Sequence, residues 1–445
     1  MQISFLKEGT GQSISLNKMI TENSVDLNDA KSMDDLMDAI GDSKYVLLGE
    51  ASHGTHEYYR WRSKISQRLI KEKGFSFIAV EGDWPDCYRL NRYVKHYKDA
   101  APTAQEVLRE FNRWPTWMWA NWEIVALAEW MRKYNEDLPQ NKRIGFYGLD
   151  VYSLWESLDA IIKYLDKVDP KAKAVAMDAW KCFEPYSEDE GQSYARATQH
   201  AWVPASCESE VIDLLIEIRK RMQQYDGDPE ATLNTEQNAI VAVNAERYYR
   251  AMIKGGPQSW NIRDHHMVDT LNRLMQHHGI HAKAIVWEHN THIGDARATD
   301  MRYDNMVNVG QLVNEQHFHD GVFSVGFGSY EGSVIAGRSW GDMMRVMQVP
   351  KAKADSWEFI LHQDGAKDRI VFMNNEMREL WGTKEIGHRA IGVVYNPQWE
   401  YGNYVPSVMP SRYDAFIFID KTKALHPLHI QTDAHQIPET YPFGV

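Results

Sequence analysis

Residues 45–54 read Tyr-Val-Leu-Leu-Gly-Glu-Ala-Ser-His-Gly. The apolar run Tyr45–Leu48 has no polar alternation, which is typical of a strand whose two faces are both covered. A glycine, an acid and a histidine follow within five residues, so chemically active side chains stand where the strand ends. This stretch therefore predicts a buried strand that brings Glu50 and His53 to the edge of a sheet.

The same pattern recurs along the chain. Other short apolar runs end in polar residues, namely Phe75–Val80 before Glu81, Ile144–Leu149 before Asp150, and Ala284–Trp287 before Glu288 and His289. Helical patterns lie between them, at about residues 31–40, 56–73, 84–97, 121–135 and 258–278. Strands that alternate with helices predict an α/β fold with a mainly parallel sheet flanked by helices. Because ligands bind beyond the carboxyl ends of such strands, we expect one site to include Glu50, Glu81, Asp150 and His289.

The remaining segments differ in pattern. Residues 155–257 read as nearly continuous amphipathic helix, so we predict a helical insertion there. Residues 1–154 and 258–330 would then form one discontinuous α/β catalytic domain. From residue 331 to 445, strand-like runs alternate with Gly, Pro and Asn turns, which predicts a smaller α+β subdomain that completes the site.

The composition argues against several function classes. The 445 residues carry a net charge of −13, which opposes binding to nucleic acid and to anionic membranes. No apolar run approaches the ~20 residues of a membrane span, and the first residues lack a signal-peptide pattern. The three cysteines, Cys87, Cys182 and Cys207, include no C-x-x-C motif, which favours a reducing compartment. We therefore expect a cytoplasmic protein.

His53 is the first candidate for catalysis. Thr55 is a suitable N-cap, so a helix is predicted from residue 56 to about residue 73. The partial positive charge of that helix N-terminus disfavours an imidazolium at His53, and a neutral imidazole can act as a general base. Arg62 lies at the edge of the apolar stripe of the helix, and its side chain leans toward His53. Both residues also have structural interpretations, as a loop histidine and as a surface arginine.

Two further stretches carry candidates. Glu81 follows an apolar strand, whereas Asp83 fits a helix cap because Pro85 suits the first turn of a helix. Residues 114–123, which include Trp117 and Trp119, are rich in tryptophan. They either pack in the core or form a wall for a bulky, partly apolar substrate.

His289 and His292 form a His-x-x-His pair after the last of these strands. They could ligate a metal with Glu81, since a catalytic zinc normally needs three protein ligands. The other interpretation is a hydrogen-bonding scaffold that orients a base and stabilises an oxyanion. Arg263 and Asp264 are expected to form a local charge pair on a helix.

Nucleophile and cofactor motifs are absent from the sequence. A nucleophile elbow requires Gly-x-Ser-x-Gly, but Glu50 stands where the first glycine would precede Ser52. The cysteines have no histidine motif near them. There is no P-loop or dinucleotide fingerprint, and we predict no cofactor.

Taken together, the motifs resemble those of the erythromycin esterase family. The resemblance rests on these segments, in this order: Gly49–Gly54, Val80–Trp84, Trp117–Glu123, Trp260–Asp264 and His289–His292. It extends over about residues 25–440. It implies a ChaN/EreA-like α/β fold and the hydrolysis of a macrolactone ester without a covalent intermediate.

The resemblance also implies roles for single residues. His53 would be the general base that deprotonates water, and Glu50 and Glu81 would orient and polarise it. The carbonyl region of the substrate, with its developing negative charge, would be bound by Arg62, His289 and His292. We further expect the substrate to contact the side chains of Trp117, Trp119, Asn290 and Arg263.

Three functions are open at this point. The first is a metal-independent esterase acting on a small-molecule ester, with a role in the response to antibiotics if that ester is a macrolide. The second is a metal-dependent hydrolase with His289, His292 and Glu81 as ligands. The third is a non-enzymatic or accessory protein of exopolysaccharide (succinoglycan) biosynthesis, since members of the family also carry that label.

Overall fold

The computed structural model describes residues 4–6, 13–189, 192–198, 206–221 and 229–429, and a nine-stranded sheet lies at its centre. The strands run in the order β3 (Ser24–Asp26), β10 (Arg369–Phe372), β13 (Ala415–Thr422), β8 (Val322–Ala336), β4 (Tyr45–Leu48), β7 (Ala284–Trp287), β5 (Phe77–Asp83) and β6 (Gly145–Asp150), with β9 (Arg345–Val349) paired to β8. Every pair from β13 to β6 is parallel, while β3, β10 and β9 make antiparallel pairs. The predicted mainly parallel sheet is confirmed.

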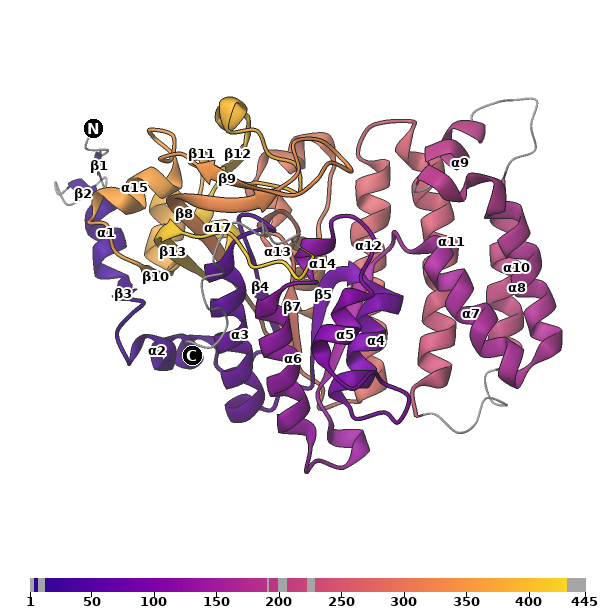
Figure 1. The fold of residues 1–445 in the computed structure, drawn as a ribbon. Helices are drawn as coiled ribbons and strands as arrows, with labels where there is room; N and C mark the ends of the chain where they lie inside the picture. The colour runs from indigo at the N-terminus through magenta and orange to yellow at the C-terminus, as the bar shows by residue number, and fades with distance from the viewer. Residues whose placement is uncertain (1–3, 7–12, 190–191, 199–205, 222–228, 430–445) are drawn as a thin grey trace, which may run out of the picture.

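Helices cover both faces of this sheet. One face carries α2 (Ser32–Ile40), α3 (His56–Lys73), α5 (Ala104–Arg109) and α6 (Trp122–Asn135), and α4 (Trp84–Val94) packs beside β6. Figure 1 shows α3, α5 and α6 in front of the strands. The other face carries α1 (Leu16–Glu22), α12 (Gln258–His278), α14 (Val309–His317), α15 (Trp357–Gln363), α16 (Asn375–Trp381) and α17 (Met409–Arg412). The sheet is therefore buried on both sides, which explains its continuous apolar strands.

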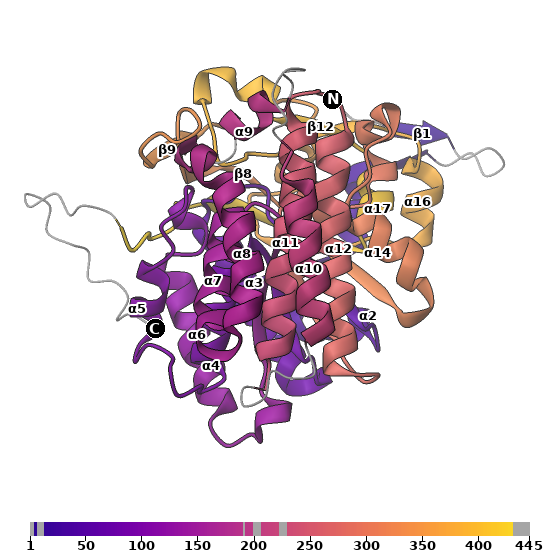
Figure 2. The same cartoon turned by 90° about the vertical axis from the view of Figure 1, so that its right-hand side faces the viewer.

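The segment in which we predicted an insertion is helical. It contains α7 (Leu154–Val168), α8 (Pro170–Phe183), α9 (Gln192–Ala197), α10 (Glu208–Arg221) and α11 (Ala231–Met252). These helices bury a hydrophobic cluster of their own. In Figure 2, α7, α8, α10 and α11 stand side by side next to α12.

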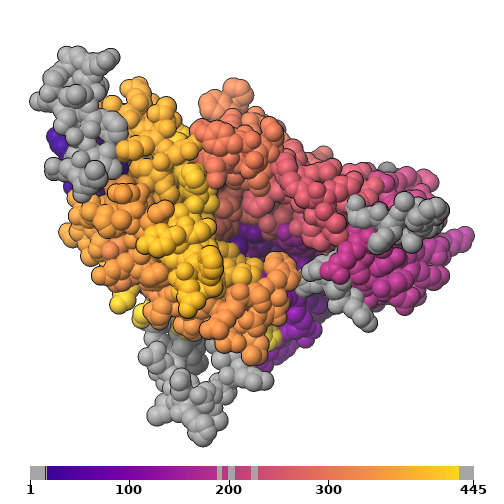
Figure 3. Space-filling model, turned by 90° about the horizontal axis from the view of Figure 1, so that it is seen from above, coloured from indigo at the N-terminus to yellow at the C-terminus, as the bar shows by residue number. Residues whose placement is uncertain are grey.

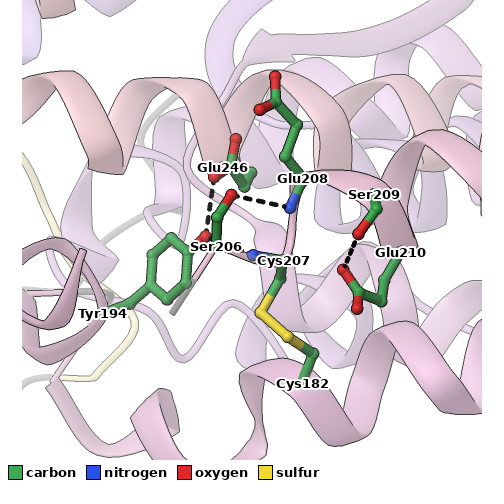
Figure 4. Close-up of a disulfide and its surroundings, with 8 residues drawn as sticks. All are labelled: Cys182, Tyr194, Ser206, Cys207, Glu208, Ser209, Glu210 and Glu246. Atoms are coloured by element: carbon green, nitrogen blue, oxygen red, sulfur yellow. Dashed lines mark hydrogen bonds between the residues drawn. A yellow bond between two sulfur atoms is a disulfide. The ribbon is translucent and has the colours of Figure 1, made fainter. Parts of the chain in front are cut away.

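A disulfide joins Cys182 to Cys207 within these helices (Figure 4). The sequence favoured reduced cysteines because the pair is 25 residues apart and forms no short motif. The fold brings the end of α8 against the residue that precedes α10, so sequence spacing hid the pairing. Cys87 is the buried free thiol. The cysteine argument for a reducing compartment is therefore wrong, because a disulfide is typical of oxidising surroundings.

The C-terminal part of the chain is interwoven with the main sheet. We expected a smaller unit from residue 331, but β8 runs through that position and β10 and β13 lie in the main sheet. Two strands of this part, β11 (Ile386–Arg389) and β12 (Tyr404–Ser407), form a separate two-stranded sheet. Another two-stranded sheet joins β1 (Ser4–Leu6) and β2 (Ser13–Ser15).

Two glycines allow the turn after β4 to pack closely. A Cβ atom on Gly49 would lie 2.1 Å from Oδ1 of Asn290, and one on Gly54 would lie 1.9 Å from the carbonyl oxygen of Ile335. Any larger residue would push the turn away from β8 and from the segment that follows β7. The motif around His53 is thus held in place by close backbone contacts.

None of the helices in the described part of the chain combines the length and apolar character needed to cross a membrane.

Candidate active site

The carboxyl ends of four neighbouring parallel strands meet at one edge of the sheet. His53 follows β4, Glu81 lies in β5, Asp150 ends β6 and His289 follows β7. All four side chains line one cavity of about 450 Å³. Seen from above in Figure 3, the molecule is hollowed between the orange and yellow C-terminal residues and the pink and magenta helices. Three of the four residues that we expected to share a site, Glu81, Asp150 and His289, therefore lie together at this edge with His53, whereas Glu50 does not line the cavity.

His53 is held from behind by Glu50. The Nδ1 atom of His53 lies 2.9 Å from Oε1 of Glu50, and Nη2 of Arg62 donates to Oε2 of Glu50 at 2.6 Å. A carboxylate only accepts hydrogen bonds, so Nδ1 of His53 carries the proton and Nε2 is left to receive one. Glu50 lies outside the cavity wall, in a position to fix the tautomer and the orientation of the imidazole.

Arg62 is completely buried and does not reach the cavity. Its guanidinium carbon lies 4.4 Å from the ring centre of Tyr59 and 4.7 Å from that of Trp287. We expected Arg62 to contact the substrate, and the structure contradicts this. The helix places the side chain inward as predicted, but Glu50 stands between it and His53.

The pKa of His53 differs from the sequence expectation. Burial lowers the pKa of His53, but the negative charges of Glu81 and Glu50 and the hydrogen bond that His53 donates to Glu50 outweigh burial, so the pKa is raised above 6.5. We expected the N-terminus of α3 to keep the imidazole neutral. That partial charge is weaker than two nearby carboxylates, one of them in direct contact.

Glu81 is an ionised carboxylate at the centre of the site. Its Oε1 accepts from Nη2 of Arg263 at 2.7 Å, and its Oε2 accepts from the backbone N–H of His289 at 2.8 Å. Burial acts to raise its pKa, but His292, His53 and Arg263 together hold that pKa far below 4.5. Glu81 is thus a fixed negative charge facing the cavity.

Arg263 links three of these groups. Its Nε and Nη2 atoms donate to the two oxygens of Asp150 at 2.9 and 2.6 Å, and its Nη1 donates to Nε2 of His292 at 2.9 Å. We expected Arg263 to pair with its neighbour Asp264, which is wrong. Successive helical residues point in different directions, so Arg263 faces the strand ends while Asp264 lies behind His292.

The contacts of His292 fix its tautomer. A guanidinium only donates, so Nε2 of His292 accepts from Arg263 and Nδ1 carries the proton that it donates to Asp264, at 2.9 Å. Trp260 stacks on the imidazole with ring centres 4.5 Å apart and planes 5° apart. His292 is therefore held rigidly in the cavity wall.

His289 faces His53, with ring centres 4.9 Å apart. Its Nδ1 accepts from the backbone N–H of Thr291, so the proton of the neutral ring is on Nε2. That Nε2 is buried and has no hydrogen-bond partner of normal geometry among the described residues. Burial, together with the neighbouring His53 and His292, holds the pKa of His289 well below 6.5.

The contacts also bear on the metal interpretation. Both nitrogens of His292 and both oxygens of Glu81 are already bonded to protein groups, and Arg263 occupies the space between them. Binding of a metal by His289, His292 and Glu81 would require Arg263 to withdraw. The arrangement instead matches the alternative interpretation, a hydrogen-bonded scaffold.

Aromatic side chains form much of the cavity wall. They are Phe111, Trp114, Trp119, Tyr152, Trp260 and Trp340. Trp119 was predicted, whereas Trp117 is only 1% exposed and packs in the core. Asn290 is also outside the wall, because its carboxamide bonds with the backbone N–H and C=O of Phe327. The expectation of substrate contact is therefore wrong for Trp117 and Asn290.

Several lining residues were missed by sequence reasoning. Asp83 stands at the N-cap position of α4, as expected, but its side chain makes no capping hydrogen bond; it lines the cavity and forms a two-bond ion pair with Arg113, at 2.5 and 2.8 Å. Asp86 also lines it, and burial together with the charge of Asp83 raises its pKa to about 7. The acidic run after Glu81 was visible in the sequence. Nothing in the sequence indicated that Asp83 pairs with Arg113, because the two residues are 30 positions apart.

Neither of the side chains considered as nucleophiles is placed for attack. The hydroxyl of Ser52 is bonded to that of Thr55, and Ser52 does not line the cavity. Burial raises the pKa of the Cys87 thiol well above its ordinary value, so it remains protonated.

Known proteins share this fold and sequence pattern. The family described as Erythromycin esterase matches residues 70–422. Erythromycin esterase type II from Escherichia coli is 21% identical over 364 residues, covering 77% of this chain and 83% of that protein. Among solved structures, a succinoglycan biosynthesis protein has a TM-score of 0.71 at 21% identity, covering 92% of this chain and 97% of the other. A mutant of the erythromycin esterase EreC in its open conformation has a TM-score of 0.65 at 14% identity, covering 88% and 94%.

Proposed function

Since the chain belongs to the erythromycin esterase family, we propose that it is a carboxylic ester hydrolase in which His53 activates a water molecule. The observation that carries this proposal is the ordered set Arg62–Glu50–His53, in which a buried ion pair fixes the base. Its Nε2 is the nitrogen left to accept a proton, and His53 lines the cavity together with the carboxylate of Glu81.

In the proposed reaction, Nε2 of His53 takes a proton from water while the water oxygen attacks the ester carbonyl carbon. The resulting imidazolium is stabilised by Glu50 and Glu81, whose negative charges already raise the pKa of His53. When the tetrahedral intermediate collapses, the C–O bond to the alcohol breaks and His53 returns the proton to the leaving oxygen. The products are an acid and an alcohol, and no covalent enzyme intermediate is formed.

His289 is the best-placed donor for the developing oxyanion. Its ring is neutral, its Nε2 carries the proton, and that N–H has no hydrogen bond of normal geometry among the described residues. Because this Nε2 is buried, the ring would have to turn toward the cavity, where a substrate oxygen would satisfy the donor and its negative charge would be stabilised. Arg263 is fully occupied by Asp150, Glu81 and His292, so it holds the site together rather than binding the oxyanion.

The cavity supports a small, partly apolar substrate. Its volume of about 450 Å³ and its aromatic wall fit a compact ligand rather than a polymer. The Escherichia coli relative is named for erythromycin, so macrolides are the first esters to test, and a role in the response to antibiotics would follow from their turnover.

The test is hydrolysis of macrolides and of simple aryl and alkyl esters by the wild type and by His53→Ala, with and without EDTA, followed by mass spectrometry. We expect cleavage that adds one water, resists EDTA and is lost in the folded variant. Activity that depends on added metal would instead favour the metal-dependent hydrolase. A folded wild type that cleaves no ester in the panel would contradict the proposal and favour an accessory role in exopolysaccharide biosynthesis.

A further inference from the structure

Two histidines and a glutamate meet outside the active-site cavity. His56 is the first residue of α3, Glu123 lies in the first turn of α6, and His426 belongs to the segment that follows β13. None of the three lines the cavity described above. The possible ligand atoms of this His–Glu–His cluster all lie within 4.8 Å of one another.

Only one of the two carboxylate oxygens of Glu123 is hydrogen-bonded within the cluster. Nδ1 of His56 and Nδ1 of His426 lie 2.6 and 2.7 Å from the same oxygen, Oε1 of Glu123. The other oxygen, Oε2, is buried and has no hydrogen-bond partner among the described residues. A buried carboxylate oxygen without a partner is costly, so hydrogen bonding alone accounts poorly for this arrangement.

The donor set is the one that zinc uses. Imidazole nitrogen and carboxylate oxygen are common Zn²⁺ ligands, and two histidines with one glutamate form a known three-ligand set that leaves a fourth position for water. The side chains of His56 and His426 are 20% and 38% exposed, so water and metal can reach the cluster. The side chain of Glu123 is 3% exposed, which places the negative charge on the protein side of the site.

A second His–Glu group, by contrast, already contains a positively charged side chain. Glu230 lies near His277 and His278, but Nζ of Lys95 donates to its Oε1 at 2.6 Å and Tyr147 donates to the same oxygen at 2.7 Å. The ammonium group already supplies a positive charge there. No ammonium or guanidinium contact to Glu123 is found among the described residues.

We propose that His56, Glu123 and His426 bind one divalent transition-metal ion, of which Zn²⁺ is the representative, with water as the remaining ligand. In this geometry the lone pairs of both Nδ1 atoms turn from the carboxylate to the ion. The carboxylate then uses the ion, instead of two N–H groups, as its partner. The N-termini of α3 and α6 oppose a cation, but only through fractional charges, whereas Glu123 contributes a full negative charge.

The ion would fasten the segment from Lys423 to Leu428 across two helices. That segment already makes backbone bonds on both sides: Lys423 C=O accepts from His56 N–H, Leu425 N–H donates to Gly54 C=O, His426 C=O accepts from Trp122 N–H, and Leu428 N–H donates to Ala120 C=O. Gly54 is next to His53, and Ala120 is next to Trp119. The ion would therefore stabilise the structure close to the active site and would not take part in the reaction.

The proposal is tested by adding Zn²⁺ to the full-length, EDTA-treated and dialysed protein, with calorimetry, elemental analysis and thermal unfolding as readouts. We expect one equivalent at about micromolar affinity or tighter and a higher Tm in Zn²⁺. Glu123→Gln keeps a hydrogen-bond acceptor but removes the charge, and should weaken binding at least tenfold and abolish the shift in Tm. His426→Gln is the second variant if Glu123→Gln does not fold, and His281→Ala, at an exposed histidine, is the matched control.

Two outcomes would overturn the proposal. One is a wild type that takes up no Zn²⁺ under these conditions. The other is uptake that survives in Glu123→Gln and His426→Gln but is lost in His292→Asn, which would place the ion in the active-site cavity. Neither outcome depends on finding a substrate, so the test is independent of the proposed esterase activity.

Discussion

Arg62 and Glu50 form an ion pair that has no access to solvent: Nη2 of Arg62 lies 2.6 Å from Oε2 of Glu50, and both side chains are at most 1% exposed. A buried pair of this kind is fragile, because the loss of one partner leaves the other charge unpaired. Here the other oxygen of Glu50 holds the imidazole of His53. The pair therefore links the packing of α3 to the protonation of the base.

We predict that Arg62→Lys lowers kcat by about tenfold or more, because an ammonium cannot replace a planar group lying against the rings of Tyr59 and Trp287. Since Arg62 acts through Glu50, the pH dependence of kcat/KM should shift as well. Arg60→Lys, on the exposed face of the same helix, is the control and should keep wild-type kinetics. Unchanged kinetics in Arg62→Lys would show that Glu50 needs no guanidinium.

We predict that His53→Ala lowers kcat by about 10² or more, as expected for the loss of a general base. Ser52→Ala should stay within a few-fold of the wild type, because Ser52 does not line the cavity. Single-turnover assays on both folded variants provide the measurement. The reverse result, with Ser52 essential and His53 dispensable, would point to a covalent route.

We predict that kcat/KM rises with pH through an apparent pKa above 6.5, because the base must be neutral and its pKa is raised. Glu81→Gln removes a negative charge that raises this pKa, so the rising limb should move to lower pH while its plateau falls. The pH profiles of the two proteins give the answer. A limb that stays in place would mean that another group titrates.

Glu288 provides a prediction about stability. It is completely buried, and neither of its oxygens has a hydrogen-bond partner in the part of the chain that the structure describes. Burial, with the charges of Glu81 and Asp264, raises its pKa well above 4.5. The folded protein therefore holds a proton that the unfolded chain releases, so this contribution to stability is present below the unfolded pKa and is lost as pH rises.

Glu288→Gln cannot lose a proton, and should be more stable than the wild type at about pH 8 but nearly equal to it at about pH 4. A gain of about 1 kcal/mol would raise Tm by a few degrees at most. Thermal unfolding of both proteins across this range is the measurement. A constant difference at all pH values would mean that Glu288 does not titrate on unfolding.

Two neighbouring tryptophans should behave differently. Trp119 lines the cavity, and Trp119→Ala should raise KM by about tenfold, or ~1.4 kcal/mol of binding free energy. Trp117 is buried in the core, and Trp117→Ala should lower the free energy of unfolding by about 3–5 kcal/mol with little change in KM. Denaturant titration and steady-state kinetics separate the two effects. Equal changes in KM would mean that both rings meet the substrate.

The helices and strands of the fold were predictable because the pattern that specifies each of them lies within one continuous stretch of sequence. The apolar run at residues 284–287 is β7, and the helical patterns at 56–73 and 258–278 are α3 and α12. Strand ends placed His53, Glu81, Asp150 and His289 at one edge, since parallel strands share a direction. Local periodicity was sufficient for this much.

Pairing between distant residues was not predictable in the same way. Arg263 bonds with Asp150 and not with the adjacent Asp264, and Cys182 bonds with Cys207. Each of these pairs depends on where two separate elements cross. The prediction for the pKa of His53 was wrong for a related reason. The sequence showed the helix that follows His53, but not that the charge of Glu81, from another strand, lies beside it.

The ion pair of Asp150 and Arg263 joins the two points where the chain enters and leaves the helical segment, because Asp150 ends β6 and Arg263 lies near the start of α12. Among the described residues between Tyr152 and Trp260, none lines the cavity. The α7–α11 helices therefore stand apart from the reacting groups, although α11 is also bonded to the main fold, for example through Asn234 to Trp84 and through Gln237 to Thr270. Substitutions on the solvent side of those helices should therefore leave substrate selectivity unchanged, whereas substitutions of the tryptophans in the cavity wall should alter it.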